Sequence, residues 1–307
     1  MNPVKGIVLK LIAVVLFIIM AALIKAASDS VPPGQAVFFR SVFAIPVILA
    51  WLAWRHDLRT GLKVASPMGH FWRGFVGTVA MGLGFAGLGL LPLPEVTALG
   101  YAAPLLTVVL AAMFLNEKVG FYRIGAVALG FVGVMIVLSP RLTSLDAEVV
   151  EITQALGAIL VLTSALCAAI AQIYIRKLVA TEQTSAIVFY FSLTSTVLSL
   201  LTLPFGWVVP GAFEVVCLVL AGLIGGTAQI FLTSAYRYAD ASVVAPFDYA
   251  SMIFALAIGY VFFDEVPTGT MLGGAALVIL AGILIIWREH HLGLKRGQAR
   301  SLKTPQG

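Results

Sequence analysis

ALGYAAPLLTVVLAAMFLNEKV, residues 98–119, is the stretch that decides the fold, because its landmarks return later in the chain. A step of 148 residues takes Tyr101 to Tyr249 and Glu117 to Glu265. Other pairs share this step or one of 151 residues: Gly74 with Gly222, Gly77 with Gly225, Gly125 with Gly273, Lys25 with Arg176, Phe38 with Phe189 and Ser41 with Ser192. The sequence therefore predicts an internal repeat that spans most of the chain.

The composition predicts a membrane protein. Of the 307 residues, 61% are hydrophobic and 11% are charged, whereas soluble domains are about 45–50% apolar and about 25% charged. A membrane-spanning barrel would alternate apolar and polar residues over segments of about ten residues. The long apolar runs at 11–24 and 275–287 do not alternate. We therefore expect an all-α, polytopic membrane protein.

A helix needs roughly 20 mostly apolar residues to cross the hydrocarbon core. Ten such segments can be placed along the chain, at 7–27, 34–54, 71–91, 95–115, 121–139, 155–175, 184–203, 214–235, 242–263 and 267–287. Each half then holds five spans, an odd number, so the two copies cross the membrane in opposite senses. We expect two inverted five-helix repeats, at 7–139 and 155–287, with a substrate site between them near the bilayer midplane.

The distribution of charge predicts the orientation and excludes a nucleic-acid-binding role. The net charge is +5, but the basic residues gather on one predicted side, as the positive-inside rule requires of cytoplasmic loops. That side receives Lys5, Lys10, Arg55, Arg59, Lys63, Arg73, Lys118, Arg123, Arg176, Lys177, Arg237, Arg288, Lys295, Arg296, Arg300 and Lys303. Only Lys25, Arg40 and Arg141 fall on the other side. Both termini are expected in the cytoplasm, where the basic tail at 288–307 would contact anionic membrane lipid.

The motifs of catalysis and of ATP-driven transport are missing. No phosphate-binding G-x-x-x-x-G-K-[ST] run occurs, so transport would be downhill or coupled to an ion gradient. The four histidines, at 56, 70, 290 and 291, lie in predicted loops or at a span edge without metal-ligand spacing. We therefore expect no enzyme activity, no metal and no cofactor.

Ionisable residues inside the bilayer are costly and become functional candidates. Asp248 lies within the ninth predicted span, two residues after Pro246. It could bind a substrate amine or carry a coupling proton. Alternatively it has a structural role, paired with Arg237 or a nearby hydroxyl. Pro246 and Pro104 each remove an intrahelical hydrogen bond, so we expect the ninth and fourth spans to bend there.

Arg40 lies inside the second span and could attract an anionic group of a substrate or pair with Asp29 or Glu95. Lys25 and Arg176 are repeat mates at the ends of the first and sixth spans. Their long side chains could reach the headgroups or take part in gating.

Tyr101 and Tyr249 are repeat mates on the two proline-bent spans, where they could line a cavity and stack on a flat substrate. Four further residues are binding candidates: Gln172, Gln229, Tyr236 and Phe247. Glu117 and Glu265 end the fourth and ninth spans at opposite faces, where they could cap, pair or gate.

The pattern resembles the drug/metabolite transporter superfamily, and within it the EamA-type ten-helix proteins. The resemblance rests on Lys25, on residues 33–40, on the 98–119 stretch, on the glycine run at 125–134 and on the second-half stretch 262–286. It implies a secondary transporter of a small organic metabolite in a bacterial inner membrane, working by alternating access. The second half departs from the pattern: Phe191 replaces the arginine and Met252 replaces the proline.

The stretch at 71–105 is similar to the branch that contains riboflavin and S-adenosylmethionine uptake carriers. This resemblance implies riboflavin uptake as the first substrate expectation, with export of amino acids or related metabolites as the alternative. Two readings of other classes remain, a membrane-embedded enzyme acting on lipid and a scaffold that transports nothing. The sequence leaves the oligomeric state and the direction of transport undecided.

Overall fold

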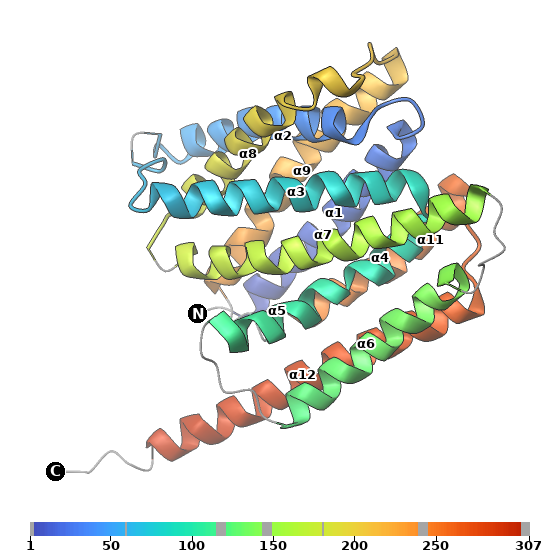
Figure 1. The fold of residues 1–307 in the computed structure, drawn as a ribbon. Helices are drawn as coiled ribbons and strands as arrows, with labels where there is room; N and C mark the ends of the chain where they lie inside the picture. Colours follow the sequence, from blue (N-terminus) through green and yellow to red (C-terminus); the bar gives the residue numbers. More distant parts are fainter. Residues whose placement is uncertain are drawn as a thin grey trace.

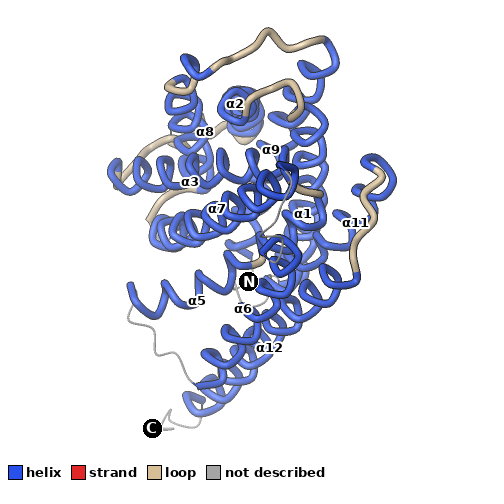
Figure 2. The backbone as a smooth tube through the Cα atoms, turned by 45° about the vertical axis from the view of Figure 1, so that its right-hand side comes forward, coloured by secondary structure: helices blue, strands red, loops and turns tan. Residues whose placement is uncertain are grey.

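A computed structural model describes residues 3–58, 60–114, 121–142, 149–179, 181–238 and 245–301 of the chain. Within these residues all regular structure is helical (Figure 2). The elements, drawn in Figure 1, are α1 Pro3–Ala27, α2 Pro33–Trp54, α3 Pro67–Leu90, α4 Leu93–Gly100, α5 Ala102–Phe114, α6 Phe121–Leu142, α7 Val149–Val179, α8 Thr184–Leu200, η1 Leu203–Phe205, α9 Ala212–Tyr238, η2 Ala245–Ala250, α11 Ser251–Phe263 and α12 Gly269–Ser301. The expected all-α fold is confirmed.

The long apolar helices agree with a membrane-spanning bundle. Six helical segments are long and apolar enough to cross a bilayer: Val4–Ala27, Pro33–Trp54, Pro67–Leu90, Leu93–Leu110, Ile152–Val179 and Ala212–Ala235. Shorter apolar helices occupy Ile124–Ser139, Thr184–Leu200, Phe247–Phe263 and Gly269–Leu284. Each of these segments overlaps one of the expected spans. The ten-span count and the cytoplasmic termini stay predictions.

The fourth expected span is interrupted, and the ninth changes helix type. The fourth divides into α4 and α5 at Tyr101. The described part of the ninth, from residue 245, is the 3₁₀ helix η2, which passes directly into α11. Pro104 explains the break in the fourth, because it cannot donate to the carbonyl four residues earlier and its ring crowds that carbonyl. In the structure Pro104 lies in the first turn of α5, where no such bond is needed. Both spans are therefore irregular near their prolines: the fourth has a break three residues before Pro104, and the ninth has 3₁₀ geometry around Pro246.

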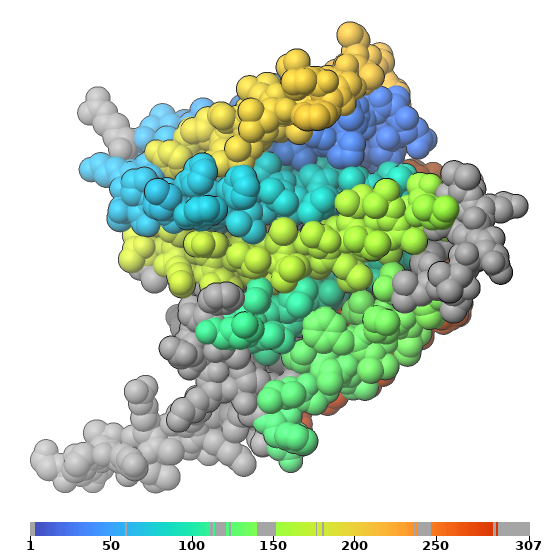
Figure 3. Space-filling model, in the orientation of Figure 1, coloured from blue at the N-terminus to red at the C-terminus, as the bar shows by residue number. Residues whose placement is uncertain are grey.

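The helices pair between the two predicted halves of the chain. α1 packs along α9, α3 along α7, α2 along α8 and α6 along α12. Figures 1 and 3 show α3 and α7 side by side across one face, and Figure 1 shows α6 and α12 forming a separate pair below them. By the sequence repeat, α1 corresponds to α7, α2 to α8, α3 to α9 and α6 to α12. Replacing each helix by its counterpart turns the α1–α9 pair into the α7–α3 pair and leaves the α2–α8 and α6–α12 pairs unchanged. The packing therefore follows the same symmetry as the sequence repeat.

Glycines let paired helices approach closely. A methyl group at Gly274 of α12 would come within 2.8 Å of the Gly133 carbonyl and the Val137 nitrogen of α6. In α3, methyl groups at Gly74 and Gly87 would overlap side chains of α8 and α7. Small residues are enriched at helix contacts in membranes because close backbones gain van der Waals contact. The glycine-rich third span thus has a packing role.

The outer surface is apolar, as lipid contact requires. Val132 of α6, Ile159 of α7 and Val197 of α8 lie within their helices and are each more than 50% exposed. Soluble monomers rarely expose large continuous apolar areas. These side chains would lie against lipid rather than water.

Candidate functional site

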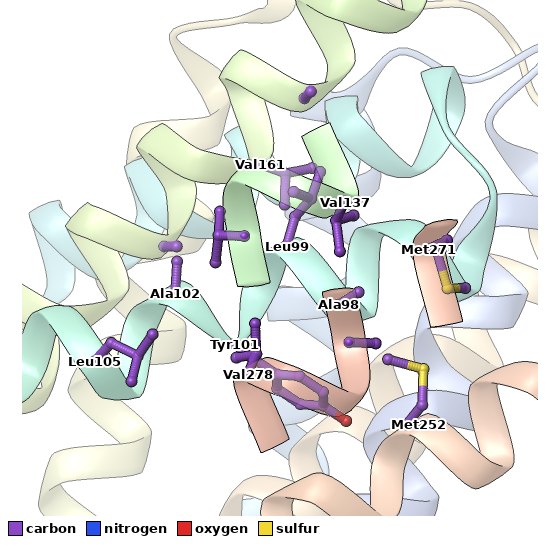
Figure 4. Packing of buried hydrophobic residues seen from close by; sticks show 14 of the residues in the cluster. Ala98, Leu99, Tyr101, Ala102, Leu105, Val137, Val161, Met252, Met271 and Val278 are labelled. Atoms are coloured by element: carbon purple, nitrogen blue, oxygen red, sulfur yellow. The ribbon is translucent and has the colours of Figure 1, made fainter. Parts of the chain in front are cut away.

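The two irregular spans meet at a pair of tyrosines. The Tyr101 and Tyr249 rings contact each other edge to face, with centroids 5.0 Å apart. The Tyr101 hydroxyl lies 2.7 Å from the Ser251 hydroxyl, and it donates to the Tyr249 carbonyl at 3.3 Å. Both rings are buried in an apolar cluster, which Figure 4 shows with Leu99, Met252 and Val278 around Tyr101. The expectation that both tyrosines line a cavity is not met in this conformation, since they close on each other.

Asp248 forms an ion pair that the sequence analysis did not anticipate. Its carboxylate lies 2.7 Å from the ammonium nitrogen of Lys10, seven residues into α1. The Lys10 side chain is 2% exposed and that of Asp248 is 37% exposed. The expected partner, Arg237, has a side chain outside the described residues. Lys10, counted in the sequence analysis with the basic residues of the cytoplasmic side, lies buried within α1; its side of the membrane stays a prediction.

Lys25 and Glu265, both expected to act in gating, lie together. The Lys25 ammonium is 3.0 Å from a Glu265 oxygen and donates to the carbonyls of Leu88 and Leu91 at 3.2 and 2.7 Å. The other Glu265 oxygen accepts the backbone N–H of Leu93 at 2.8 Å. Lysine thus caps the carbonyl end of α3 and glutamate caps the N–H end of α4, as helix dipoles favour. Lys25 therefore does not reach outward to headgroups.

The two ion pairs tie one helix to one segment at two levels. Lys10 and Lys25 are both on α1, and fifteen residues of helix separate them by about 22 Å. Their partners, Asp248 and Glu265, lie at opposite ends of the η2–α11 segment. The hydrocarbon core is about 30 Å thick, so a separation of about 22 Å places one ion pair toward each end of the bundle. Tyr249 lies on the same η2–α11 segment, next to Asp248.

Arg40 and Arg73 are buried around one aromatic ring. Their guanidinium carbons lie 5.5 and 3.6 Å from the centroid of Phe191 in α8. Arg40 is 2% exposed and Arg73 is 4% exposed, and Arg40 Nη2 donates weakly to the Gly225 carbonyl at 3.4 Å. No ion pair formed among the described residues involves either arginine. The pairing of Arg40 with Asp29 or Glu95 is therefore wrong. Arg73, counted in the sequence analysis with the basic residues of the cytoplasmic side, lies buried within α3, and its side of the membrane stays a prediction.

The remaining candidates are more scattered. Gln229 is buried in α9, while Gln172 in α7 and Phe247 in η2 are partly buried. Glu117 lies outside the described residues, as do the side chains of Tyr236 and Arg176. The sequence analysis missed Lys10 and Arg73 as site residues, although each interrupts an apolar segment and that interruption was a usable signal.

A pocket of about 200 Å³ lies between α1, α2 and α3. It is lined mainly by apolar side chains, including Ile24, Val31 and Phe85. Its lining contains none of the expected binding residues. The polar groups at the contact between halves are therefore better candidates for recognition than this pocket.

A polar corner lies at the start of α3. The Glu182 carboxylate accepts the backbone N–H groups of Ala65 and Ser66 at 2.8 and 2.7 Å and lies 3.6 Å from Nε2 of His70. Burial opposes ionisation of Glu182, but the two N–H donors and the imidazole together hold the pKa of its carboxyl below its usual range. This corner joins the loop before α3 to the turn between α7 and α8.

Together these features define a multi-pass helical membrane protein with buried polar contacts between its helices. The EamA-like transporter family matches the chain twice, over residues 4–139 and 155–288. The chain belongs to this family, as its resemblance indicated. Its family and relatives are transporters, which implies a small-molecule substrate.

Curated relatives carry different cargoes. An S-adenosylmethionine uptake transporter of Rickettsia felis is 29% identical over 83% of each chain. A pseudopaline exporter of Pseudomonas aeruginosa is 30% identical over 92% of this chain and 95% of its own length. A riboflavin transporter of Rhizobium johnstonii is 32% identical over 84% of this chain and 82% of its own length. A crystal structure with 19% identity superposes with a TM-score of 0.67 and covers 94% of this chain and 98% of the other, which supports the fold alone.

Proposed function

We propose that this protein is an inner-membrane secondary transporter that moves a small organic metabolite by alternating access between two inverted five-helix halves. The observation that carries the proposal is the contact between halves, where two irregular spans meet at Tyr101 and Tyr249. Interrupted helices near the midplane are typical binding elements of secondary transporters. The symmetric pairing of helices supports the two halves at 7–139 and 155–287.

The ion pairs suggest how access alternates. Lys10–Asp248 and Lys25–Glu265 hold α1 against the η2–α11 segment at two levels about 22 Å apart. With both pairs formed, the tyrosines between them are enclosed. Opening one pair while the other stays closed would expose the centre to one side of the membrane. Asp248, the more exposed acid, is the group that a coupling proton or a substrate amine could reach.

We consider three candidate substrates. Riboflavin uptake is the first candidate, because the flat ring system would suit a site bordered by Tyr101, Tyr249 and Phe247, and the riboflavin transporter is a relative. S-adenosylmethionine uptake is the second, with relatives of similar coverage. Export of amino acids or related metabolites is the third.

The test is uptake into proteoliposomes of labelled riboflavin, S-adenosylmethionine and a mixture of amino acids, with the Asp248→Asn variant alongside. We expect one cargo to accumulate with the native protein and to be reduced at least tenfold in the variant, with similar membrane yield. Asparagine can still hydrogen-bond Lys10, so the variant isolates the charge. Normal transport by the variant would refute the role of Asp248, and no flux of any cargo would remove the named substrates.

A further inference from the structure

The Arg40–Arg73–Phe191 cluster is a second polar site on the contact between halves. Arg40 comes from α2, Arg73 from α3 and Phe191 from α8, so both halves contribute. The Nε and Nη1 atoms of both arginines are buried without a hydrogen-bond partner in the described part of the chain. Four guanidinium nitrogens are thus buried with no acceptor for their hydrogens among the described residues.

Symmetry-related glycines make room for these groups. A methyl group at Gly77 would lie 2.6 Å from Arg73 Nη1 and 2.9 Å from the Phe191 ring. A methyl group at Gly225 would lie 3.1 Å from Arg40 Nε. Gly77 and Gly225 are repeat mates, as are Arg40 and Phe191. The sequence thus keeps space on both halves for two long cations around one ring.

This arrangement is unfavourable without a counter-charge. Burying one unpaired charge costs several kcal/mol, and two like charges near one ring also repel each other. The Phe191 face offsets a part of this through cation–π attraction, worth about 2 kcal/mol when desolvated. Ser41 and Ser192, next in sequence to Arg40 and Phe191, hold further buried hydroxyls without a partner among the described residues. Within the described part of the chain, the cluster has the donors of an anion site, and its only acceptor is the distant Gly225 carbonyl.

We infer that Arg40 and Arg73 bind the carboxylate of the transported metabolite, so that the cargo is an organic acid or an amphoteric, amino-acid-like molecule. The planar guanidinium group presents paired N–H donors that match the two oxygens of a carboxylate. The Phe191 ring supplies an apolar wall for the carbon next to that carboxylate. The inference rests on the proposed transport function only in identifying the bound anion as the cargo. Anion binding itself can be tested without transport.

The experiment uses the full chain, purified in detergent, and measures thermal stability and ligand affinity at constant ionic strength. Matched probes differ only in the acid group: succinate against succinamide, and S-adenosylmethionine against its decarboxylated form. Inorganic phosphate is a separate arm. The variants are Arg73→Gln, which removes the charge, and Arg73→Lys, which keeps the charge but lacks the paired N–H donors of the guanidinium group. Arg55→Gln is the control, because Arg55 also lies over an aromatic ring, 5.1 Å from that of Trp51, but is exposed.

We expect at least one acid to stabilise the native protein and its uncharged partner to have no effect. Arg73→Gln should bind that acid at least about tenfold more weakly, the loss expected when a charge-assisted hydrogen bond is removed. Arg73→Lys should be intermediate and Arg55→Gln unchanged. The ligand-free melting temperature of Arg73→Gln should stay the same or rise, because a buried unpaired charge is gone.

Three results would overturn the inference: equal response to acid and amide, equal response of the native protein and Arg73→Gln, or a response to phosphate alone. A fall in the ligand-free melting temperature of Arg73→Gln with unchanged acid binding would assign Arg73 a structural role instead. The outcomes also separate the two proposals. Acid binding without flux of any tested cargo in proteoliposomes would keep the anion site and remove the named substrates. Flux of neutral riboflavin that does not depend on Arg73 would keep the transport function and remove the proposed role of the arginines.

Discussion

At the scale of single residues, the Tyr101–Tyr249 pair is closely packed against a glycine of α12. Gly282 of α12 lies against the Tyr249 ring, and a methyl group there would overlap its hydroxyl oxygen and ring carbons. Only a residue without Cβ leaves this ring in place. Tyr249 in turn supports Tyr101, whose hydroxyl donates to the Tyr249 carbonyl.

Gly282→Ala should therefore destabilise the protein by about 1–3 kcal/mol, the usual cost of overfilling a packed interior. The measurement is the melting temperature of the detergent-purified protein. Adding Tyr249→Phe to this variant should recover part of the loss, because the hydroxyl is among the overlapping atoms. If Gly282→Ala melts like the native protein, the close contact between α12 and Tyr249 is not present in solution.

The Lys25–Glu265 pair makes a different prediction, because each partner also caps a helix end. Glu265→Gln should cost about 1.5–3 kcal/mol of unfolding free energy, as one charged hydrogen bond is lost. Exchanging the charges, as Lys25→Glu with Glu265→Lys, should not restore stability. A glutamate at 25 would face the carbonyls of Leu88 and Leu91, and a lysine at 265 would face the Leu93 N–H.

Thermal melting of the single and double variants checks this prediction. Recovery of native stability in the exchanged variant would mean that the two charges alone matter and that the helix caps do not. The sequence analysis named Lys25 and Glu265 separately as gating candidates, but it did not predict that they contact each other. Repeat symmetry relates Glu265 to Glu117 rather than to Lys25, so sequence spacing gave no sign of the contact.

At the scale of elements, α6 and α12 pack through Gly133 and Gly274. A methyl group at Gly274 would meet the Gly133 carbonyl and the Val137 nitrogen, both backbone atoms that cannot move aside independently. The next glycine, Gly273, is exposed, and a methyl group there meets nothing within 4 Å. Two adjacent glycines on one helix thus have opposite surroundings.

Gly274→Ala should lower stability by about 1–3 kcal/mol through separation of the two helices. Gly273→Ala should be neutral or stabilising by up to about 1 kcal/mol, because alanine favours the helix. Melting temperatures of the two variants, measured side by side, decide the matter. Equal effects would show that the α6–α12 contact does not depend on close glycine packing.

The corner formed by Glu182 predicts a pH dependence. The pKa of Glu182 is lower in the folded protein than in the unfolded chain, where it is about 4.3. Its contribution to stability is therefore complete above the unfolded value and is lost as the pH falls through the lower, folded pKa. The native melting temperature should drop more steeply in acid than that of Glu182→Gln. Parallel curves for the two proteins would contradict the contribution of this carboxylate.

Helix positions could be predicted well from the sequence, because hydrophobic runs of membrane length leave few alternatives. Each described span overlaps an expected segment, and irregularity in both proline-containing spans was expected. Burial of single charges could not be predicted in the same way. Lys10 and Arg73 lie close enough to span ends to be counted with loop charges, and only the helix rotation sets whether such a side chain faces lipid, water or protein.

At the scale of the whole molecule, pairs of repeat mates converge. Tyr101 touches Tyr249, and Arg40 lies near Phe191, although 148 or 151 residues separate the partners in sequence. Mates can meet only where a symmetry axis passes between them. The tyrosine pair and the arginine cluster therefore both lie near the axis that relates the proposed halves. A bound metabolite near this axis would contact both halves at once, as alternating access requires.

An inverted repeat also fixes which loops share a side of the membrane. Thr60 lies between α2 and α3, and Thr268 lies between α11 and α12. With cytoplasmic termini, Thr60 should face the cytoplasm and Thr268 the outside. Single cysteines at these positions, in a protein with Cys167 and Cys217 replaced by alanine, should react with an impermeant maleimide from opposite faces. Thr268→Cys should react in intact cells and Thr60→Cys only after lysis. Reaction of both in intact cells, or of neither, would contradict the inverted arrangement, and the two ion pairs on α1 could not then close opposite sides.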